Sequence, residues 1–148
     1  MTLFISKYSN NLDKKGRVSV PASFRSILSS QSQTSVILYP SIRHRCVEGC
    51  SYTRLESISK AIATLDPYSE ERDAFETIIL AESVQLSFDN EGRIILPKAL
   101  INYASLDEQV IFVGKGEVFE IWNPQDFDQY LQKAKNIAML NKGILKNL

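Results

Sequence analysis

The chain contains one short pattern twice. Asp13–Pro21 (DKKGRVSVP) recurs as Asp89–Pro97 (DNEGRIILP), and the displacement is 76 residues at both ends of the pattern, from 13 to 89 and from 21 to 97. An internal repeat constrains the fold more than composition does, because both halves are expected to adopt one local structure and to share a core. The copies differ mainly in charge, since Asn90 and Glu91 stand where the first copy has two lysines.

Each copy predicts a strand, a turn, a short strand and a helix. Tyr8 and Leu12 in the first copy, like the alternating apolar residues of 84–88 in the second, indicate a lead-in strand. An Asp-x-x-Gly turn follows, because Asp accepts backbone N–H bonds and Gly tolerates positive φ. The prolines are expected to open helices. The turn and helix-start residues are Asp13, Gly16, Pro21, Asp89, Gly92 and Pro97.

A second strand pair and further helices complete each copy. The apolar run 36–38 matches 110–112, and the capping signals at Thr53–Glu56 and Asn123–Asp126 predict later helices. A further helix is predicted from Ser69 to about Leu80.

The zero net charge of the chain hides an asymmetry. Residues 1–54 carry eight Lys or Arg against two acidic residues, a net of +6, so the rest of the chain carries −6. A basic half joined to an acidic half indicates a polyanion partner for the first, and solubility or protein contacts for the second.

Several function classes are excluded. There is one histidine, no catalytic constellation and no glycine-rich phosphate loop, so we expect neither an enzyme nor a cofactor or small-molecule substrate. His44, Cys46 and Cys50 offer three metal ligands where structural zinc needs four, so no metal site is predicted. No apolar run suits a leader or a membrane helix, and the two cysteines are expected to be reduced thiols in a cytosol.

The basic residues near the first turn permit two interpretations. In one, Asp13 caps the turn and Arg17 merely pairs with it; in the other, the turn meets phosphates and the arginine reads guanine. The structural interpretation is favoured for Arg93, whereas Lys14 and Lys15 favour DNA contact for Arg17. We hypothesise that the first copy supplies most of the nucleic-acid surface. The DNA-binding candidates are Lys7, Lys14, Lys15, Arg17, Arg25 and Arg93.

These motifs resemble those of the MraZ family of bacterial transcriptional regulators, which contain two SpoVT-AbrB-like units. The resemblance covers nearly the whole chain, from the run Tyr8–Arg25 through Phe88–Pro97 to Phe119–Trp122. The chain departs from the family pattern at Ile101, where an arginine is common.

The resemblance implies an α+β fold in which two tandem AbrB-like swapped-hairpin β-barrel units pair within one chain as a pseudo-dimer, with peripheral helices. The implied division is a first repeat over 1–54, a helical connector over 55–80, a second repeat over 81–124, and a C-terminal helix with a basic tail over 125–148. It also implies a DNA-facing surface at Asp13–Arg17 and Asp89–Arg93.

The implied protein is a cytoplasmic, nucleoid-associated ring oligomer. It would bind double-stranded DNA at repeated promoter sites of its own division and cell-wall gene cluster. Two alternatives stay open: an AbrB-type antitoxin-like protein that also binds a toxin, and a structural ring scaffold whose partner is protein.

Overall fold

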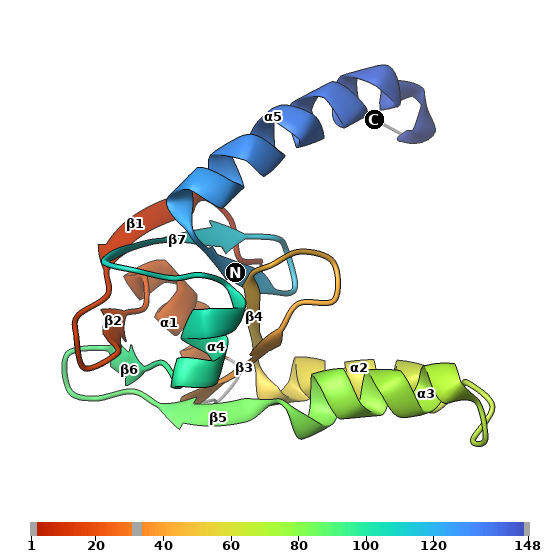
Figure 1. The fold of residues 1–148 in the computed structure, drawn as a ribbon, viewed down its shortest axis with the longest axis horizontal. Helices are drawn as coiled ribbons and strands as arrows, with labels where there is room; N and C mark the ends of the chain where they lie inside the picture. Colours follow the sequence, from red (N-terminus) through yellow and green to blue (C-terminus); the bar gives the residue numbers. More distant parts are fainter. Residues whose placement is uncertain (1–2, 31–33, 147–148) are drawn as a thin grey trace.

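The computed structural model describes residues 3–30 and 34–146, so the predicted ranges 1–54 and 125–148 lie partly outside it. The predicted α+β class is confirmed: a six-stranded antiparallel sheet and a two-stranded ladder are surrounded by helices (Figure 1). The strands are β1 (Lys7–Asn11), β2 (Arg17–Ser19), β3 (Ser35–Pro40), β4 (Val47–Cys50), β5 (Val84–Ser87), β6 (Arg93–Ile95), β7 (Gln109–Gly114) and β8 (Phe119–Trp122). The helices are α1 (Ala22–Ser30), α2 (Tyr52–Ile62), α3 (Glu70–Phe75), the π-helix η1 (Glu76–Ala81), α4 (Lys98–Tyr103), α5 (Pro124–Leu140) and the 3₁₀ turn η2 (Lys142–Ile144).

The two halves of the chain exchange strands. The six-stranded sheet has the order β1-β7-β8-β4-β3-β5, which reads the same from either edge once equivalent strands are matched. The first lead-in strand, β1, pairs with β7 of the second half, and the second lead-in strand, β5, pairs with β3 of the first. Each half therefore completes the sheet of the other, as expected for an intramolecular pseudo-dimer.

Two strand pairings mark the pseudo-twofold axis. In the ladder of β2 and β6, Val18 lies opposite Ile94, its equivalent in the second copy. In the large sheet, β4 pairs with β8 so that Glu48 lies opposite Glu120. The axis therefore passes through the two-stranded ladder and the middle of the sheet.

The main core gathers around Phe24. Its ring lies 5.2 Å from Phe4, 5.5 Å from Tyr8 and 5.1 Å from Phe119, measured between centroids. The buried face of α1 carries Phe24, Ile27 and Leu28, the helical spacing found in the sequence. This packing holds α1 against the large sheet, and the same core contains Val18 and Ile94 of the two-stranded ladder.

The predicted helix starts are right for two helices and wrong for a third. Asn123 caps α5 and Ser69 caps α3, each through its side-chain oxygen. However, the cap of α2 is Ser51, two residues before the predicted Thr53, because the Ser51 hydroxyl accepts the Arg54 N–H at 3.1 Å. Ser51 is buried and takes the capping role, so Thr53 lies inside the first turn.

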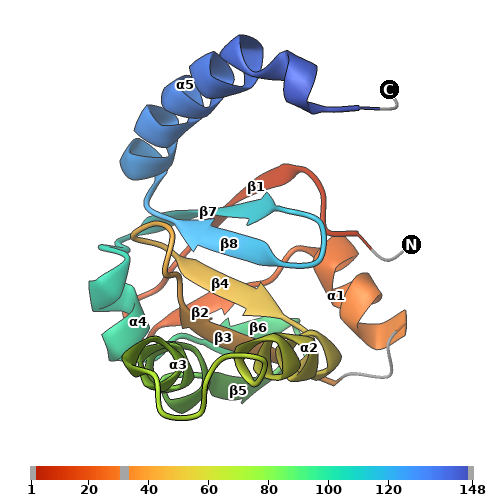
Figure 2. The ribbon, with the colours of Figure 1, turned by 90° about the vertical axis from the view of Figure 1, so that its right-hand side faces the viewer.

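Helices project from one side of the body. In Figures 1 and 2, α5 leaves the top of the sheet, and the pair formed by α2 and α3 leaves the bottom. The turns between β1 and β2 and between β5 and β6 lie at the opposite end in Figure 1. The predicted DNA-facing turns are thus well separated from the projecting helices.

Candidate nucleic-acid interface

The Asp13 carboxylate organises the first turn. It accepts the backbone N–H groups of Lys15 at 2.9 Å and Arg17 at 2.8 Å, and the Arg17 Nε–H at 2.7 Å. The backbone closes the same turn, since the Gly16 N–H donates to the Asp13 carbonyl. Gly16 has φ +83°, a left-handed conformation that explains the glycine.

The second turn repeats this arrangement. Asp89 accepts the backbone N–H groups of Glu91 at 2.8 Å and Arg93 at 2.9 Å, and the Arg93 Nε–H at 2.9 Å. The pKa of each aspartate carboxyl is lowered, chiefly by the backbone N–H of the arginine four residues on. Both copies therefore contain the Asp–Arg pair, and in each the aspartate accepts the arginine Nε–H.

The pseudo-twofold axis brings the two arginines onto one surface. Arg17 lies opposite Ile95, and Ser19 opposite Arg93, in the ladder of β2 and β6. Since side chains alternate along a strand, these four residues share one face, whereas Val18 and Ile94 point into the core. The exposed face is a small two-stranded ribbon that carries a guanidinium near each end.

Reciprocal backbone bonds lock the turns to the ribbon. The Val20 N–H donates to the Gly92 carbonyl at 3.1 Å, and the Leu96 N–H donates to the Gly16 carbonyl at 2.8 Å. Each turn is therefore held by the strand end of the other copy. These backbone bonds fix the relative positions of the two arginines on the ribbon.

Arg25 lies on the turn of the other copy. Its Nε donates to the Val20 carbonyl at 3.1 Å, and its guanidinium covers Gly92 so closely that a Cβ built there would lie 2.5 Å from the Arg25 Cζ. Arg25 and Glu91 also line one surface cavity. The first copy thus places a positive charge beside the acidic turn of the second.

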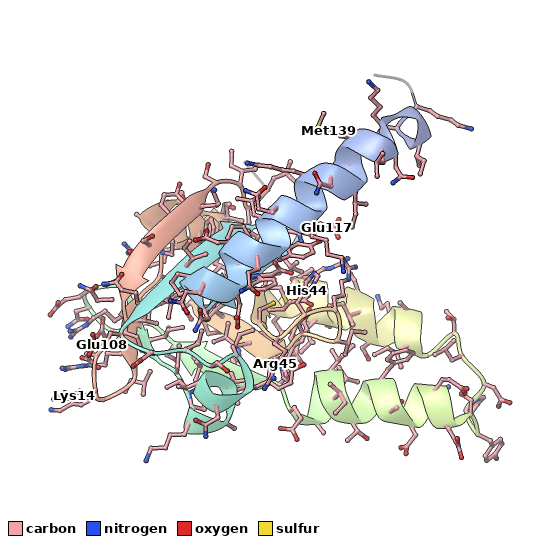
Figure 3. All side chains as sticks on the ribbon, turned by 45° about the horizontal axis from the view of Figure 1, so that its top comes forward. Lys14, His44, Arg45, Glu108, Glu117 and Met139 are labelled. Atoms are coloured by element: carbon pink, nitrogen blue, oxygen red, sulfur yellow. The ribbon has the colours of Figure 1, made fainter. Side chains whose placement is uncertain are left out.

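The other candidate lysines divide into two groups. Lys14 and Lys15 are exposed in the first turn, and Figure 3 shows Lys14 at the outer end of the molecule. Lys7 lies at the far end of β1, where its Nζ sits 5.7 Å from the centre of the Phe127 ring on α5. The structure therefore brings together all the DNA-binding candidates except Lys7.

Sequence reasoning missed two residues of this surface. Ile95 is 62% exposed and projects from the ribbon between the turns, where a methyl-bearing side chain suits contact with thymine. Strict alternation after the buried Ile94 would have predicted its exposure. Glu108 is exposed near Lys14, because the Glu108 carbonyl accepts the Leu12 N–H at 2.8 Å, and no local motif indicated this acidic neighbour (Figure 3).

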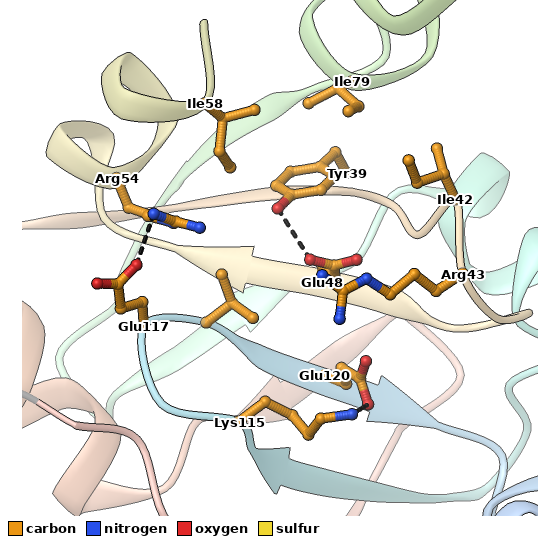
Figure 4. A pocket seen from close by; sticks show the side chains of 11 residues that line it. Tyr39, Ile42, Arg43, Glu48, Arg54, Ile58, Ile79, Lys115, Glu117 and Glu120 are labelled. Carbon is orange, nitrogen blue, oxygen red and sulfur yellow. Dashed lines mark hydrogen bonds and ion pairs between the residues drawn. The ribbon is translucent and has the colours of Figure 1, made fainter. Parts of the chain in front are cut away.

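A polar cavity of about 310 Å³ lies on the large sheet, away from the ribbon (Figure 4). Its charged groups pair with one another: Arg54 with Glu117 at 2.5 Å, and Lys115 with Glu120 at 3.6 Å. The Tyr39 hydroxyl donates to the Glu48 carboxylate at 3.0 Å. These internal pairs describe a structural cluster.

The residues first considered as metal ligands pack into the protein. Cys46 and Cys50 are buried free thiols, and burial raises the pKa of both. The His44 ring lies 4.3 Å from that of Tyr130 and 5.1 Å from that of Trp122, and burial lowers its pKa. Within 3–30 and 34–146, no three His, Cys, Asp or Glu side chains gather as a metal site would require. None of the helices in these ranges has the length and apolarity needed to cross a membrane.

Comparisons with known proteins agree with the fold. The model of the MraZ protein family, whose description likens it to antitoxins, matches residues 79–143. The chain is 55% identical over 148 residues to the transcriptional regulator MraZ of Rickettsia typhi, which covers 100% of this chain and 99% of that protein. The proteins of the same name from Rickettsia canadensis and Rickettsia rickettsii are 54% and 55% identical over 147 residues, covering 99% of both chains in each case.

These relatives are transcriptional regulators, and the pseudo-symmetric pair of Asp–Arg turns on exchanged strands fits that class of protein. The class is therefore a transcriptional regulator rather than an enzyme. The chain belongs to the MraZ family. The resemblance seen in the sequence is thereby confirmed.

Proposed function

We propose that the protein regulates transcription by binding double-stranded DNA through the ribbon of β2 and β6 and its two flanking turns. The observation that carries this proposal is the placement of Arg17 and Arg93 on one exposed face, across the pseudo-twofold axis. A two-stranded ribbon fits the major groove, and arginine pairs bidentately with guanine there.

The local charges indicate that the two turns contribute unequally to DNA binding. The first turn adds two exposed lysines to its arginine, whereas in the second Glu91 lies 3.5 Å from Arg93. Phosphate contacts supply sequence-independent affinity, and base contacts supply specificity. The first turn is therefore the stronger phosphate-binding element, and Arg25 restores positive charge beside the second.

We further propose that the protein acts as a ring oligomer on repeated sites in the promoter of its own division and cell-wall gene cluster. This would place it in the cytoplasm, on the nucleoid. A single ribbon offers few contacts and would bind weakly at physiological salt. Several linked ribbons on tandem repeats gain affinity through effective concentration.

The decisive experiment is fluorescence anisotropy with the upstream DNA of its own gene, carrying either intact or scrambled repeats, at two salt concentrations. We expect salt-sensitive binding that requires the intact repeats. Arg17→Ala should weaken it by about 1–3 kcal/mol, the range for a lost bidentate base contact. Arg45→Ala is the matched control, because Arg45 is exposed but lies away from the turns (Figure 3).

Three outcomes would contradict the proposal in whole or in part. Equal, weak binding to both DNAs would mean that the basic turns form a non-specific patch. Equal losses for Arg17→Ala and Arg45→Ala would mean that affinity follows net charge rather than the ribbon. Lys15→Glu with full affinity would remove the special role of the first turn.

One alternative function has a specific observation in its favour. The family description likens these proteins to antitoxins, which would require a protein partner in addition to DNA. Co-purification of a single unrelated protein at a fixed ratio would support that alternative, and a scaffold function would show the same result without DNA binding.

A further inference from the structure

The outer half of α5 is exposed and packs against none of the residues in 3–30 and 34–134. The base of the helix is anchored, since the Tyr130 ring stacks on Trp122 at 5.6 Å between centroids and Phe127 packs edge-on against the same ring. Beyond Ala134, every described residue is exposed, from Lys135 to Lys146. We call residues 135–146 the arm. Figure 3 shows Met139 on the arm, far from the body.

The arm is too apolar for a segment that meets only water. Five large apolar side chains lie within nine residues, and four of them are more than two-thirds exposed. They are Ile137 (48%), Met139 (73%), Leu140 (85%), Ile144 (71%) and Leu145 (69%). Scattered apolar residues on a surface are ordinary, but a contiguous cluster marks an interaction site.

An apolar groove lies on the other projecting element, the helical pair of α2 and α3. The groove between α2 and the segment formed by α3 and η1 encloses about 310 Å³ and is lined mainly by apolar side chains. Its apolar lining includes Ile42, Ile58, Ile62, Leu65, Phe75 and Ile79. Figures 1 and 2 show the arm and the helices that line this groove, α2 and α3, on separate projections, at the top and bottom of the molecule. The arm therefore does not fill the groove of its own chain.

The charges of the two elements are complementary. Residues 54–82 carry seven acidic and three basic side chains, a net of −4, and Arg54 in the groove lining is itself paired with Glu117. Residues 129–148 carry four lysines and no acidic residue, a net of +4. Complementary potentials favour encounter and correct orientation, whereas two arms or two grooves would repel each other.

We propose that the arm of one copy docks into the α2–η1 groove of a second copy. Leu140 and its apolar neighbours enter the groove, and the lysines face the acidic side chains of the surrounding segment 54–82. This inference deepens the proposed oligomer and rests on it. Because arm and groove are different surfaces, each copy would bind one neighbour with its arm and a second neighbour with its groove. Such head-to-tail contacts form a closed ring when the rotation between successive copies returns the last copy to the first. The ribbon lies at the opposite end of the molecule and stays open to DNA.

Cross-linking between two differently marked proteins tests the contact. Full-length Leu140→Cys is mixed with full-length Ala61→Cys, whose cysteine lies in the groove lining, and a short bis-maleimide is added. The native thiols are buried and do not compete. We expect a cross-linked pair between the two proteins, suppressed by high salt. The control mixes Leu140→Cys with Glu108→Cys, an exposed position at the opposite end (Figure 3). A yield no higher than this control would overturn the proposal.

Sedimentation velocity provides the second measurement. Leu140→Asp changes an exposed side chain, so the fold should survive, as circular dichroism would verify. Removing a buried apolar anchor should weaken self-association by about tenfold or more. Unchanged assembly would contradict arm docking.

Anisotropy with a DNA carrying one repeat separates this proposal from the proposed function. We expect Leu140→Asp to bind that DNA as the parent chain does, while losing the avidity for several repeats. A parent chain that is monomeric but binds one repeat would overturn arm docking and leave DNA binding intact. Loss of one-repeat binding in the parent chain, with cross-linking intact, would contradict only the DNA proposal.

Discussion

Gly92→Ala tests the unexpected contact between Arg25 and the second turn. An alanine at φ +77° destabilises the folded chain by about 1–2 kcal/mol, because its Cβ is crowded in this left-handed conformation. Alanine also lowers the conformational entropy of the unfolded chain, which offsets about 0.4–1 kcal/mol of that loss. The new Cβ would also lie 2.5 Å from the Arg25 Cζ, so the guanidinium must leave. Losing its bond to the Val20 carbonyl costs about 1 kcal/mol. The expected destabilisation is about 2 kcal/mol, or about 4–8 °C in Tm for a chain of this size.

A matched glycine isolates the contribution of Arg25. Gly116 has φ +85° and nothing within 4 Å of a built Cβ, so Gly116→Ala reports backbone strain alone. Denaturant unfolding should show Gly92→Ala to be the more destabilising by about 1 kcal/mol. In an Arg25→Ala background that difference should vanish. Equal effects of the two glycine variants in the parent chain would refute the packing of Arg25 on the turn.

Three further predictions concern charge and thiols. Because Asp13 and Asp89 have pKa values lower in the folded chain than the ordinary 3.8, their stabilisation is present above that pH and is lost as the pH falls through the folded values. The stability difference between the parent chain and the double Asp→Asn variant, measured by denaturant unfolding at neutral pH, should therefore shrink when measured at about pH 3. Glu108→Gln should strengthen DNA binding in an anisotropy titration at low salt and have less effect at high salt, since screening weakens exposed charges. Burial raises the pKa of Cys50 to about 12 and also raises that of Cys46, so Ellman's reagent should detect neither thiol at mildly alkaline pH until denaturant is added.

Local sequence signals predicted the turns well because each is made by near neighbours. Asp13 and Arg17 are four residues apart, and their bonds need nothing from the rest of the chain. The alternation of Val18 and Ser19 likewise fixed which face of the short strand is buried. The cap of α2 was misplaced because two hydroxyl residues compete there, and only tertiary burial selects Ser51.

Contacts between distant residues escaped the sequence reasoning. Lys7 and Phe127 come together only through the pairing of β1 with β7, and Arg25 meets Gly92 only through the pairing of β2 with β6. Apolar periodicity alone does not tell whether a strand pairs within its own half or with the other, because both arrangements bury the same face. The exchange of strands was predicted from the family resemblance instead.

The exchange of strands also determines the order in which the sheet can form during translation. The ribosome releases β1 well before β7, the strand with which it pairs among the described residues and which begins at Gln109. Local helices can form on the growing chain, whereas contacts between distant segments must wait for the second segment and fold slowly. A nascent chain that stops before Gln109 leaves Lys7–Asn11 as an unpaired edge strand, so the six-stranded sheet is completed only after the second half of the repeat has been made.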